Sequence, residues 1–329
     1  MPSALVRLLT TSPRLPAGLL SWRAWEAVRT GQLCAADADA ALPRAVRGCG
    51  LAVAQVSLID SGAAARDLLR RARGGAPVVW LAGPDGDADL VRALARAAVA
   101  VDPLGTQPAA GDPVEIEVIH GSWDPPGARL LDVVAVMDRL RSPGGCPWDA
   151  EQTHRSLRRY LLEEAYEAYD ALVDEDLTAL REELGDVLLQ VAFHARLAEE
   201  ADPPWTIDDV AGDLVAKLVR RHPHVFADRT VAGAGEVETN WEQIKRAEKG
   251  RTSVTEGLAR SQPALALAQA LVRRAGSAGL PPPGPGPTLG ERLLEVVRDA
   301  HEAGLDAEAE LRVAADRYAA ALRAAELTD

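Results

Sequence analysis

Five acidic residues on two predicted helices constrain this chain more than any other feature. Glu163, Glu164 and Glu167 lie in the segment Glu-Glu-Ala-Tyr-Glu, and Glu183 and Asp186 follow in Glu-Leu-Gly-Asp. On a helix that turns about 100° per residue, Glu164 and Glu167 lie within about 60° of each other. Glu183 and Asp186 have the same relation. Each helix therefore presents a pair of carboxylates on one side.

The two acid pairs lie on consecutive helices, predicted for residues 153–173 and from 177 to about 199. Thr153 is suited to cap the first helix, and the connection Asp174-Glu175-Asp176 is so short that the helices must be adjacent and antiparallel. The carboxylate of Glu164 is expected to face the bundle interior, because apolar residues share its stripe. These residues are Leu157, Leu161, Ala168 and Ala171.

Carboxylates that converge from neighbouring helices repel one another unless a cation compensates their charge. Mg²⁺ takes oxygen ligands and commonly shares them with substrate phosphates. We therefore predict an Mg²⁺ site, which Mn²⁺ also fills, formed by Glu164, Glu167, Glu183 and Asp186. A single Glu-x-x-Glu pair would more often be a solvated surface. Two pairs separated by one short turn, within an apolar stripe, favour the metal.

A di-iron centre is not expected, because Glu-x-x-His pairs supply such sites in helical bundles. The spacing occurs at Glu117 with His120 and at Glu151 with His154, and neither pair involves the four acids. His194 is interpreted as a packed or surface histidine.

Basic and aromatic residues further along fit a ligand that carries phosphate and a base. Lys217 and Arg221 share one face at the end of a helix predicted for Ile207 to Arg221, where they can contact phosphate oxygens. The helix dipole alone would also favour cations there. Trp241, with Lys245 beside it, and Trp148 offer aromatic faces for stacking on a base, although each is more often a core residue or a cap.

The charge of the chain argues against a nucleic-acid partner. The formal net charge is −13. Residues up to Pro126 hold 12 Lys/Arg against 13 Asp/Glu, a balance of −1, so the remainder carries −12. Nucleic-acid binding needs many cations, whereas an acidic portion suits a protein that gathers carboxylates around a metal, or one that is merely soluble. No apolar run approaches 18 residues, so a membrane span is not expected and the cytoplasm is the expected location.

The chain divides into four predicted parts. Residues 1–120 form an α/β domain with strands at Leu51–Ile59, Pro77–Ala82 and Val114–Ile119 and helices at Gly62–Arg73 and Asp87–Val101. Residues 121–127 are a linker. Residues 128–250 are helical, with Pro143 to Pro147 as a rigid loop after the first helix. Residues 251–329 hold further helices at Leu289–Ala303 and Ala307–Leu327, beyond a proline-rich spacer. The fold class is mainly α, with a smaller α/β domain first.

Several motifs between residues 128 and 250 together resemble the MazG family. They are Gly145-Cys146-Pro147-Trp148-Asp149, Glu151-Gln152-Thr153-His154, the two acid motifs, Lys-Leu-Val-Arg-Arg-His-Pro-His-Val-Phe at 217–226 and Trp-Glu-Gln-Ile-Lys at 241–245. The resemblance implies an all-α NTP pyrophosphatase fold, a homodimer, and Mg²⁺-dependent hydrolysis of (d)NTP to monophosphate and pyrophosphate, as in nucleotide-pool sanitation. It implies that Glu164, Glu167, Glu183 and Asp186 are the metal ligands. Phosphate contacts fall on Lys217 and Arg221, and the family tryptophan falls on Trp241.

The chain departs from the two-domain family pattern at both ends. Residues 251–329 resemble a degenerate second MazG-like repeat, with Thr288 where the first acid of Glu-x-x-Asp belongs. Residues 1–120 lie where some relatives carry a tetrapyrrole-methylase-like domain, but no cofactor-binding loop supports that activity here.

Three functions remain open at this point. The first is the broad pyrophosphohydrolase, with Glu163 as the carboxylate that orients the attacking water. The second is a narrower relative that acts on dUTP or phosphoribosyl-ATP. The third is a non-catalytic nucleotide-sensing or interaction module, against which the complete set of four acids argues.

Overall fold

The computed structural model describes most of the chain. The described residues are 4–99, 114–228, 230–233, 235–237, 240–241, 244, 248, 253–281, 284 and 286–326. Contacts divide the chain into two compact units, Met1–Val210 and Ala211–Asp329. The boundary falls within one helix, α9 (Ile207–Arg221), so that its first residues belong to one unit and the rest to the other.

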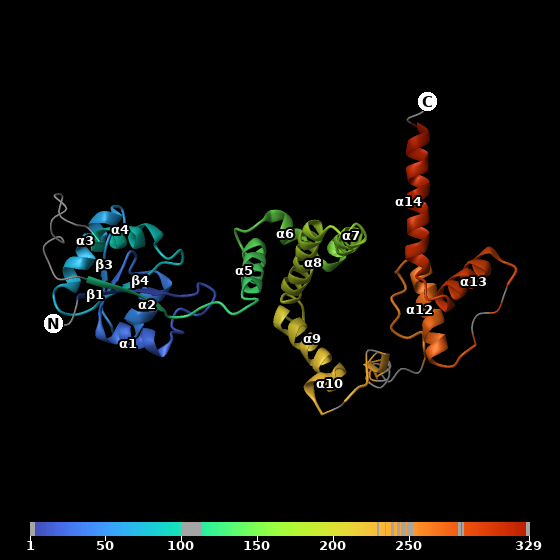
Figure 1. Cartoon of the computed structure of the whole chain (residues 1–329), viewed down its shortest axis with the longest axis horizontal. Helices are drawn as coiled ribbons and strands as arrows, with labels where there is room; N and C mark the ends of the chain where they lie inside the picture. The colour runs from blue at the N-terminus through green and yellow to red at the C-terminus, as the bar shows by residue number, and fades with distance from the viewer. Residues whose placement is uncertain are drawn as a thin grey trace. The chain divides into compact units, whose positions relative to one another are not determined.

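The first part of the chain is an α/β layer structure (Figure 1). Its strands are β1 (Ala4–Thr10), β2 (Gln32–Ala35), β3 (Val53–Gln55), β4 (Val78–Leu81) and β5 (Val114–His120). Its helices are α1 (Trp22–Thr30), α2 (Ala41–Gly48), α3 (Ser61–Ala72) and α4 (Ala88–Val99). The strands form one parallel sheet in the order β3-β2-β4-β1-β5.

Each face of this sheet carries its own apolar core. Val6, Leu8 and Trp80 pack against α3 and α4 on one face, whereas Leu9 and Leu81 pack against α1 and α2 on the other. A parallel sheet that is covered on both faces buries continuous apolar runs instead of alternating ones. The run Val-Val-Trp-Leu of β4 is accordingly buried throughout.

The strand and helix predictions in this region were partly right. β4, β5, α3 and α4 lie where the sequence predicted them, whereas the strand predicted for Leu51–Ile59 shortens to β3, because β3 pairs only with β2 and only over three residues. β1, β2, α1 and α2 were not predicted. Ser21 caps α1 by accepting a hydrogen bond from the amide of Ala24, and serine is among the residues preferred at this position.

The helical part begins with α5 (Arg129–Arg141), followed by α6 (Pro147–Glu151), α7 (His154–Val173) and α8 (Leu177–Ala198). Thr153 and Ser156 form a capping box at the start of α7, and Asp176 caps α8 through the amides of Thr178 and Ala179. The short connection between them makes α7 and α8 antiparallel neighbours along their length, as predicted.

A small core holds these helices together. Met137 of α5, Leu157 of α7 and Phe193 of α8 are buried in it, together with Ala192 and Leu197. Ala168 and Ala171 of α7 are buried as predicted, but Leu161, predicted on the same stripe, is 40% exposed. Within one chain α7 packs mainly against α8. The apolar stripe of α7 is wider than this contact, so part of the stripe remains exposed to solvent.

The loop predicted for Pro143 to Pro147 contains the start of a helix. Pro147 is the first residue of α6, a position that suits its fixed backbone angle and missing N–H. Gly145 lies against the carbonyls of Arg139 and Leu140, where any side chain would collide with the backbone. Arg141 fixes the loop by donating to the carbonyl of Gln152 at 3.2 Å, while its other edge pairs with Glu200.

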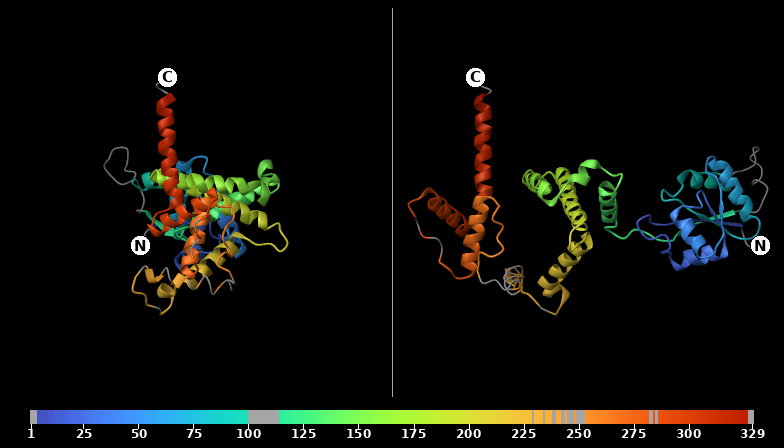
Figure 2. Two further views of the ribbon diagram at one scale, coloured as in Figure 1. Left: turned by 90° about the vertical axis from the view of Figure 1, so that its right-hand side faces the viewer. Right: turned by 180° about the vertical axis from the view of Figure 1, so that it is seen from behind.

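The remaining helices are α9 (Ile207–Arg221), α10 (Pro223–Phe226), α12 (Ala264–Ser277), α13 (Leu289–Glu302) and α14 (Ala307–Glu326). The bounds of α9 match the prediction. Thr288, predicted to replace the first acid of a second acid motif, caps α13 in a capping box with Glu291. α14 packs against α12 and α13 near its start and then extends beyond them (Figures 1 and 2).

None of the helices in the described part of the chain combines the length and the apolar character that crossing a bilayer requires.

Candidate functional site

Three of the predicted metal ligands converge between α7 and α8. Carboxylate oxygens of Glu164, Glu167 and Glu183 all lie within 4.8 Å of one another. Glu164 and Glu183 are half-buried, and Glu167 is exposed. The antiparallel packing of the helices produces this arrangement, because it sets the two acid motifs at the same level.

The electrostatics of this cluster are unfavourable without a cation. Removal from water, followed by the nearby charges of Asp186 and Glu167, raises the pKa of Glu164 above its ordinary value. Removal from water, followed by the charges of Glu167 and Asp186, likewise raises the pKa of Glu183. Asp186 is therefore close enough to act on both carboxyl groups, although it is not part of the three-residue cluster.

The cluster has the chemistry of a hard-cation site. Within the described ranges, no lysine or arginine pairs with Glu164, Glu167 or Glu183. All the donors are carboxylate oxygens, which Mg²⁺ prefers and which thiol- or imidazole-seeking metals do not. Glu163, the predicted water-orienting residue, lies next to Glu164 on α7 with its side chain exposed.

The two predicted phosphate-binding cations differ in their surroundings. Lys217 is exposed on α9. Arg221, at the end of the same helix, is only 13% exposed and donates to a carboxylate oxygen of Glu248 from Nε at 3.1 Å and from Nη2 at 2.7 Å. Arg220 donates to the other oxygen at 2.6 Å. Sequence reasoning missed Glu248, because it lies 27 residues beyond Arg221.

The two predicted base-stacking tryptophans are both partly covered. Trp148 of α6 is 50% exposed, and its ring meets the edges of Tyr160 and Phe193 at centroid distances of 6.1 and 6.4 Å. Trp241 packs edge-on against His222 at 5.4 Å. Lys245, predicted beside Trp241, lies outside the described residues.

His154 and His194 form a pair that the sequence did not predict. Their Nδ1 atoms are 2.8 Å apart, so that one ring donates an N–H to the other. Burial, followed by the charge of His154, lowers the pKa of His194. The two rings are stacked, with their centroids 5.1 Å apart, and neither histidine is part of the three-residue carboxylate cluster.

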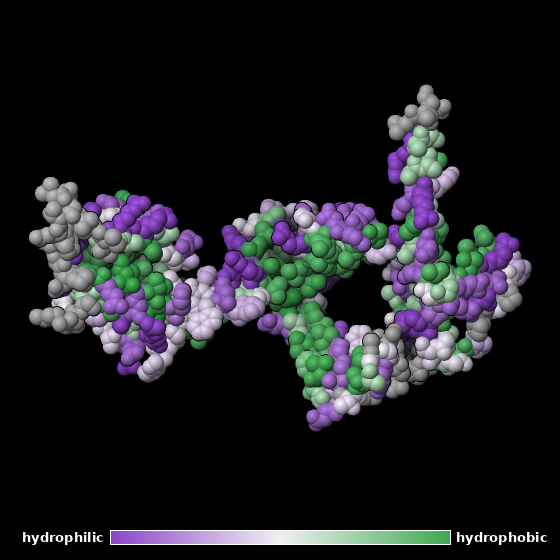
Figure 3. Space-filling model, viewed as in Figure 1, coloured by the Kyte–Doolittle hydropathy of each residue, from purple (hydrophilic) through white to green (hydrophobic). Residues whose placement is uncertain are grey.

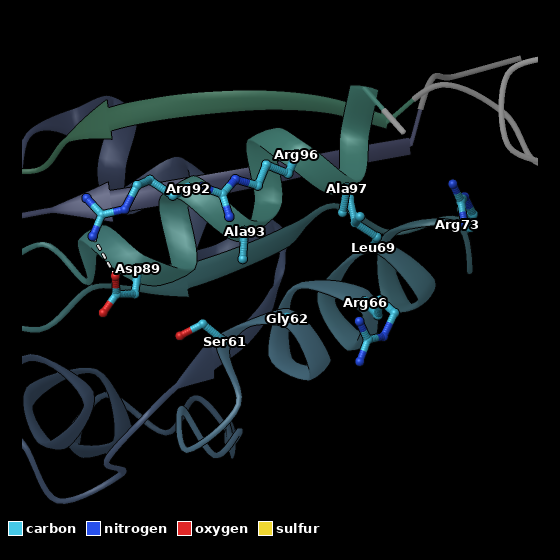
Figure 4. Close-up of a pocket in the computed structure, with 10 residues that line it drawn as sticks. All are labelled: Ser61, Gly62, Arg66, Leu69, Arg73, Asp89, Arg92, Ala93, Arg96 and Ala97. Carbon is cyan, nitrogen blue, oxygen red and sulfur yellow. Dashed lines mark hydrogen bonds and ion pairs between the residues drawn. The ribbon is translucent and has the colours of Figure 1, made fainter. Parts of the chain in front are cut away.

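A separate hollow lies in the α/β part, between α3 and α4, with a volume of about 940 Å³ (Figure 4). Its lining is basic, whereas the carboxylate cluster is acidic. Arg92 pairs with Asp89, and Arg66 lies 4.0 Å from Asp60. The other arginines at its edge are Arg73 and Arg96. The hollow has the wrong charge for a cation, so the candidate catalytic residues remain those of α7 and α8.

Known proteins resemble this chain over the helices that carry the carboxylate cluster. A family model described as the MazG nucleotide pyrophosphohydrolase domain matches residues 152–226. This range contains α7, α8, α9 and α10, and with them the five acidic residues of the two acid motifs, Glu163, Glu164, Glu167, Glu183 and Asp186.

Three relatives extend this likeness beyond the matched domain. An uncharacterized 26.1 kDa protein in the blaB 3′ region of Streptomyces cacaoi is 52% identical over 75% of this chain and 99% of its own length. The nucleoside triphosphate pyrophosphohydrolase of Mycobacterium tuberculosis is 48% identical over 61% of this chain and 59% of its own. The Escherichia coli K12 protein of the same name is 43% identical over 54% of this chain and 69% of its own. The chain therefore matches only part of the length of the two named enzymes.

Proposed function

The chain belongs to the MazG family, and on that basis we propose that it hydrolyses nucleoside and deoxynucleoside triphosphates to the monophosphate and pyrophosphate. The observation that carries this proposal is the cluster of Glu164, Glu167 and Glu183, whose oxygens lie within 4.8 Å without a cationic side chain among the described residues to compensate them. A divalent cation that also binds a polyphosphate would remove the repulsion.

Mg²⁺ is the proposed cofactor, with Mn²⁺ as a substitute, and Glu164, Glu167, Glu183 and Asp186 are its proposed ligands. When bound, the ion supplies positive charge that neutralises phosphate oxygens and polarises the α-phosphorus. Asp186 would complete the set of ligands, because its charge acts on Glu164 and Glu183.

The other residues of the chain bind the substrate and move the proton. Glu163, exposed beside the cluster, accepts the proton from the attacking water. Lys217 and Arg221 neutralise the charge that develops on the leaving pyrophosphate. Trp241 and Trp148 offer faces for the base, and Lys245, four residues after Trp241 in the sequence, adds a further cation.

A product panel tests this function. Canonical and oxidised (d)NTPs, together with dUTP and phosphoribosyl-ATP, are incubated with the full chain and Mg²⁺, and the products are separated. We expect monophosphate and pyrophosphate from several triphosphates, as required for nucleotide-pool sanitation in the cytoplasm. Diphosphate and phosphate would refute the assigned bond. Turnover of one substrate alone would establish a narrow enzyme, and tight binding without product would establish a sensing module.

We also propose a homodimer, because apolar side chains lie on the surface of α7 and α8. Four exposed apolar residues of α7 recur at helical spacing and form one stripe, and three of α8 form another; these seven are between 36% and 76% exposed. They are Leu162, Tyr166, Tyr169 and Val173 on α7, and Leu177, Leu184 and Val191 on α8. The surface around α8 is coloured as hydrophobic in Figure 3. Contiguous apolar surface of this kind usually marks a protein interface.

Charge placed on this stripe should separate the subunits. Leu162→Glu and Tyr169→Glu each place a carboxylate in the proposed apolar contact, so that light scattering coupled to gel filtration is expected to show monomers where the unmodified chain is a dimer. Leu289→Glu, which charges an exposed leucine at the start of α13, serves as the control and should leave the dimer intact. A monomeric unmodified chain, or dimers in both α7 variants, would exclude this interface.

A further inference from the structure

Glu248 makes a larger set of contacts than a surface carboxylate usually does. Three N–H groups reach it: Nε and Nη2 of Arg221, both on Oε2, and Nε of Arg220 on Oε1. The side chain of Glu248 is 14% exposed and that of Arg221 is 13% exposed. These bonds lower the pKa of Glu248 to about 2, with the bond from Arg221 as the largest cause. Glu248 is therefore ionised at every pH at which the enzyme would work.

The geometry of the contact leaves part of Arg221 available. A guanidinium carries five N–H donors, and Glu248 occupies the edge formed by Nε and Nη2. Within the described part of the chain, no other acceptor bonds to Arg221. The opposite edge, formed by Nη1 and the second hydrogen of Nη2, can therefore bind a phosphate while Glu248 stays in place. Two arginines and one glutamate also leave the group with a net charge of +1.

Two roles for Glu248 are compatible with these contacts. In the first, the carboxylate stands in for a substrate phosphate and leaves when substrate arrives. That exchange would leave a mostly buried carboxylate without the arginines that pair with it, which is strongly unfavourable. In the second, the carboxylate stays and fixes the direction of Arg221. Because the free edge of Arg221 makes the exchange unnecessary, the contacts favour the second role.

A second contact in the same part of the chain supports a fixed arrangement. Trp241, seven residues before Glu248 in the sequence, packs on His222, the residue after Arg221. His222 in turn bonds through Nδ1 to the carbonyl of Leu218 at 2.7 Å. The end of α9 is thus held at two points, by the Trp241 ring and by the Glu248 carboxylate.

We propose that Glu248 is a positioning residue, which holds Arg221 by one edge of its guanidinium so that the other edge stays open to bind a phosphate group. This proposal rests on the proposed function, which assigns Arg221 to phosphate. Glu248 acts only through Arg221 and does not touch the substrate.

The proposal is tested by a double-mutant cycle on the full chain, with pyrophosphate release as the readout. Glu248→Gln keeps the size of the side chain and one acceptor oxygen but removes the charge. We expect KM for dNTP to rise on the order of 10- to 100-fold, since a misdirected binding group loses contact in this range. The value of kcat should fall by a smaller factor, because Arg221 binds phosphate in the ground state as well as neutralising charge in the transition state. Glu248→Asp, which restores the carboxylate, should recover part of the loss.

The cycle then tests whether Glu248 acts through Arg221 or in some other way. In an Arg221→Gln background, Glu248→Gln is expected to add less than about 2-fold, because its target is gone. Glu236→Gln is the control: it removes a nearby exposed charge whose carboxylate bonds to the amide of Ala232, and it should leave KM unchanged. A lower KM in Glu248→Gln would show that the carboxylate competes with substrate, and additive losses in the cycle would show that it acts elsewhere; either result overturns the proposal.

A binding measurement distinguishes failure of this proposal from failure of the proposed function. Calorimetry gives the affinity of the chain for the Mg²⁺ complex of an α,β-methylene dNTP. If the unmodified chain binds the analogue but releases no pyrophosphate, the proposed reaction is wrong. The same cycle in Kd then decides the role of Glu248. If the unmodified chain neither binds nor turns over nucleotide, both proposals fall.

Discussion

Glu167→Ala and Glu183→Ala are each expected to lower kcat/KM for pyrophosphate release by on the order of 10³-fold or more. Both residues belong to the cluster whose oxygens lie within 4.8 Å. Removing one ligand weakens the binding of the cation. The phosphate that the cation would orient is then displaced, and charge stabilisation in the transition state is lost. Steady-state assays of pyrophosphate release with Mg²⁺ in excess measure the effect.

Glu182→Ala is the matched control for these two variants. Glu182 is an exposed acid directly before Glu183, so its loss makes the same change of charge on the same helix. It is expected to keep activity within about 3-fold, as is usual for surface substitutions away from special features. Unchanged turnover in both Glu167→Ala and Glu183→Ala would disprove the assignment of the cluster.

Thermal stability should depend on pH and on Mg²⁺ in a way that follows from the raised pKa values of Glu164 and Glu183. A carboxyl group whose pKa is higher in the folded chain binds its proton more tightly there, so protonation favours the folded state. The resulting stability is complete below the ordinary pKa of 4.5 and is lost as pH rises through the raised folded value. With a chelator present, Tm is therefore expected to fall across this window.

Mg²⁺ should reverse that fall at neutral pH. The ion binds the folded cluster and not the unfolded chain, so at about 100 times its Kd it is expected to raise Tm by roughly 5 °C. Glu183→Gln removes one of the repelling charges. It should raise the metal-free Tm at pH 7 and remove most of the response to Mg²⁺. Differential scanning calorimetry in chelator and in millimolar Mg²⁺ measures both effects.

Glu200→Gln provides a control of opposite sign. The hydrogen bond from Arg141 is the main cause that lowers the pKa of Glu200, so its stability is present above the ordinary pKa and lost as pH falls. The Gln variant should therefore lower Tm at pH 7 and keep the full shift with Mg²⁺. If the unmodified chain shows no shift at millimolar Mg²⁺, the cluster is not a preformed cation site.

The helices that carry the site were predictable because their signals are local. Thr153 and Asp176 cap α7 and α8, an apolar periodicity of 3.6 residues runs between them, and the connection of three residues permits only an antiparallel pair. From the spacing of the acids on those helices, the meeting of Glu164, Glu167 and Glu183 follows directly.

The features that escaped prediction depend on distant partners. β1 has no clear alternation, and its Arg7 pairs with Glu117 of β5, 110 residues later. The His154–His194 pair and the contact of Arg221 with Glu248 likewise join residues 40 and 27 positions apart. Burial of Leu161 was predicted from its place on the stripe, but in one chain its surroundings include too few neighbouring helices to cover it.

One crystal structure tests the central claim most directly: the full chain grown with Mg²⁺ and an α,β-methylene dNTP. The claim is that acids from neighbouring antiparallel helices meet on a divalent cation that also holds the triphosphate. It predicts an ion bound by Glu164, Glu167, Glu183 and Asp186, with oxygens at about 2.1 Å, and phosphate oxygens completing its coordination. A bound nucleotide with Glu164 and Asp186 apart in solvent, and no ion between them, would contradict it.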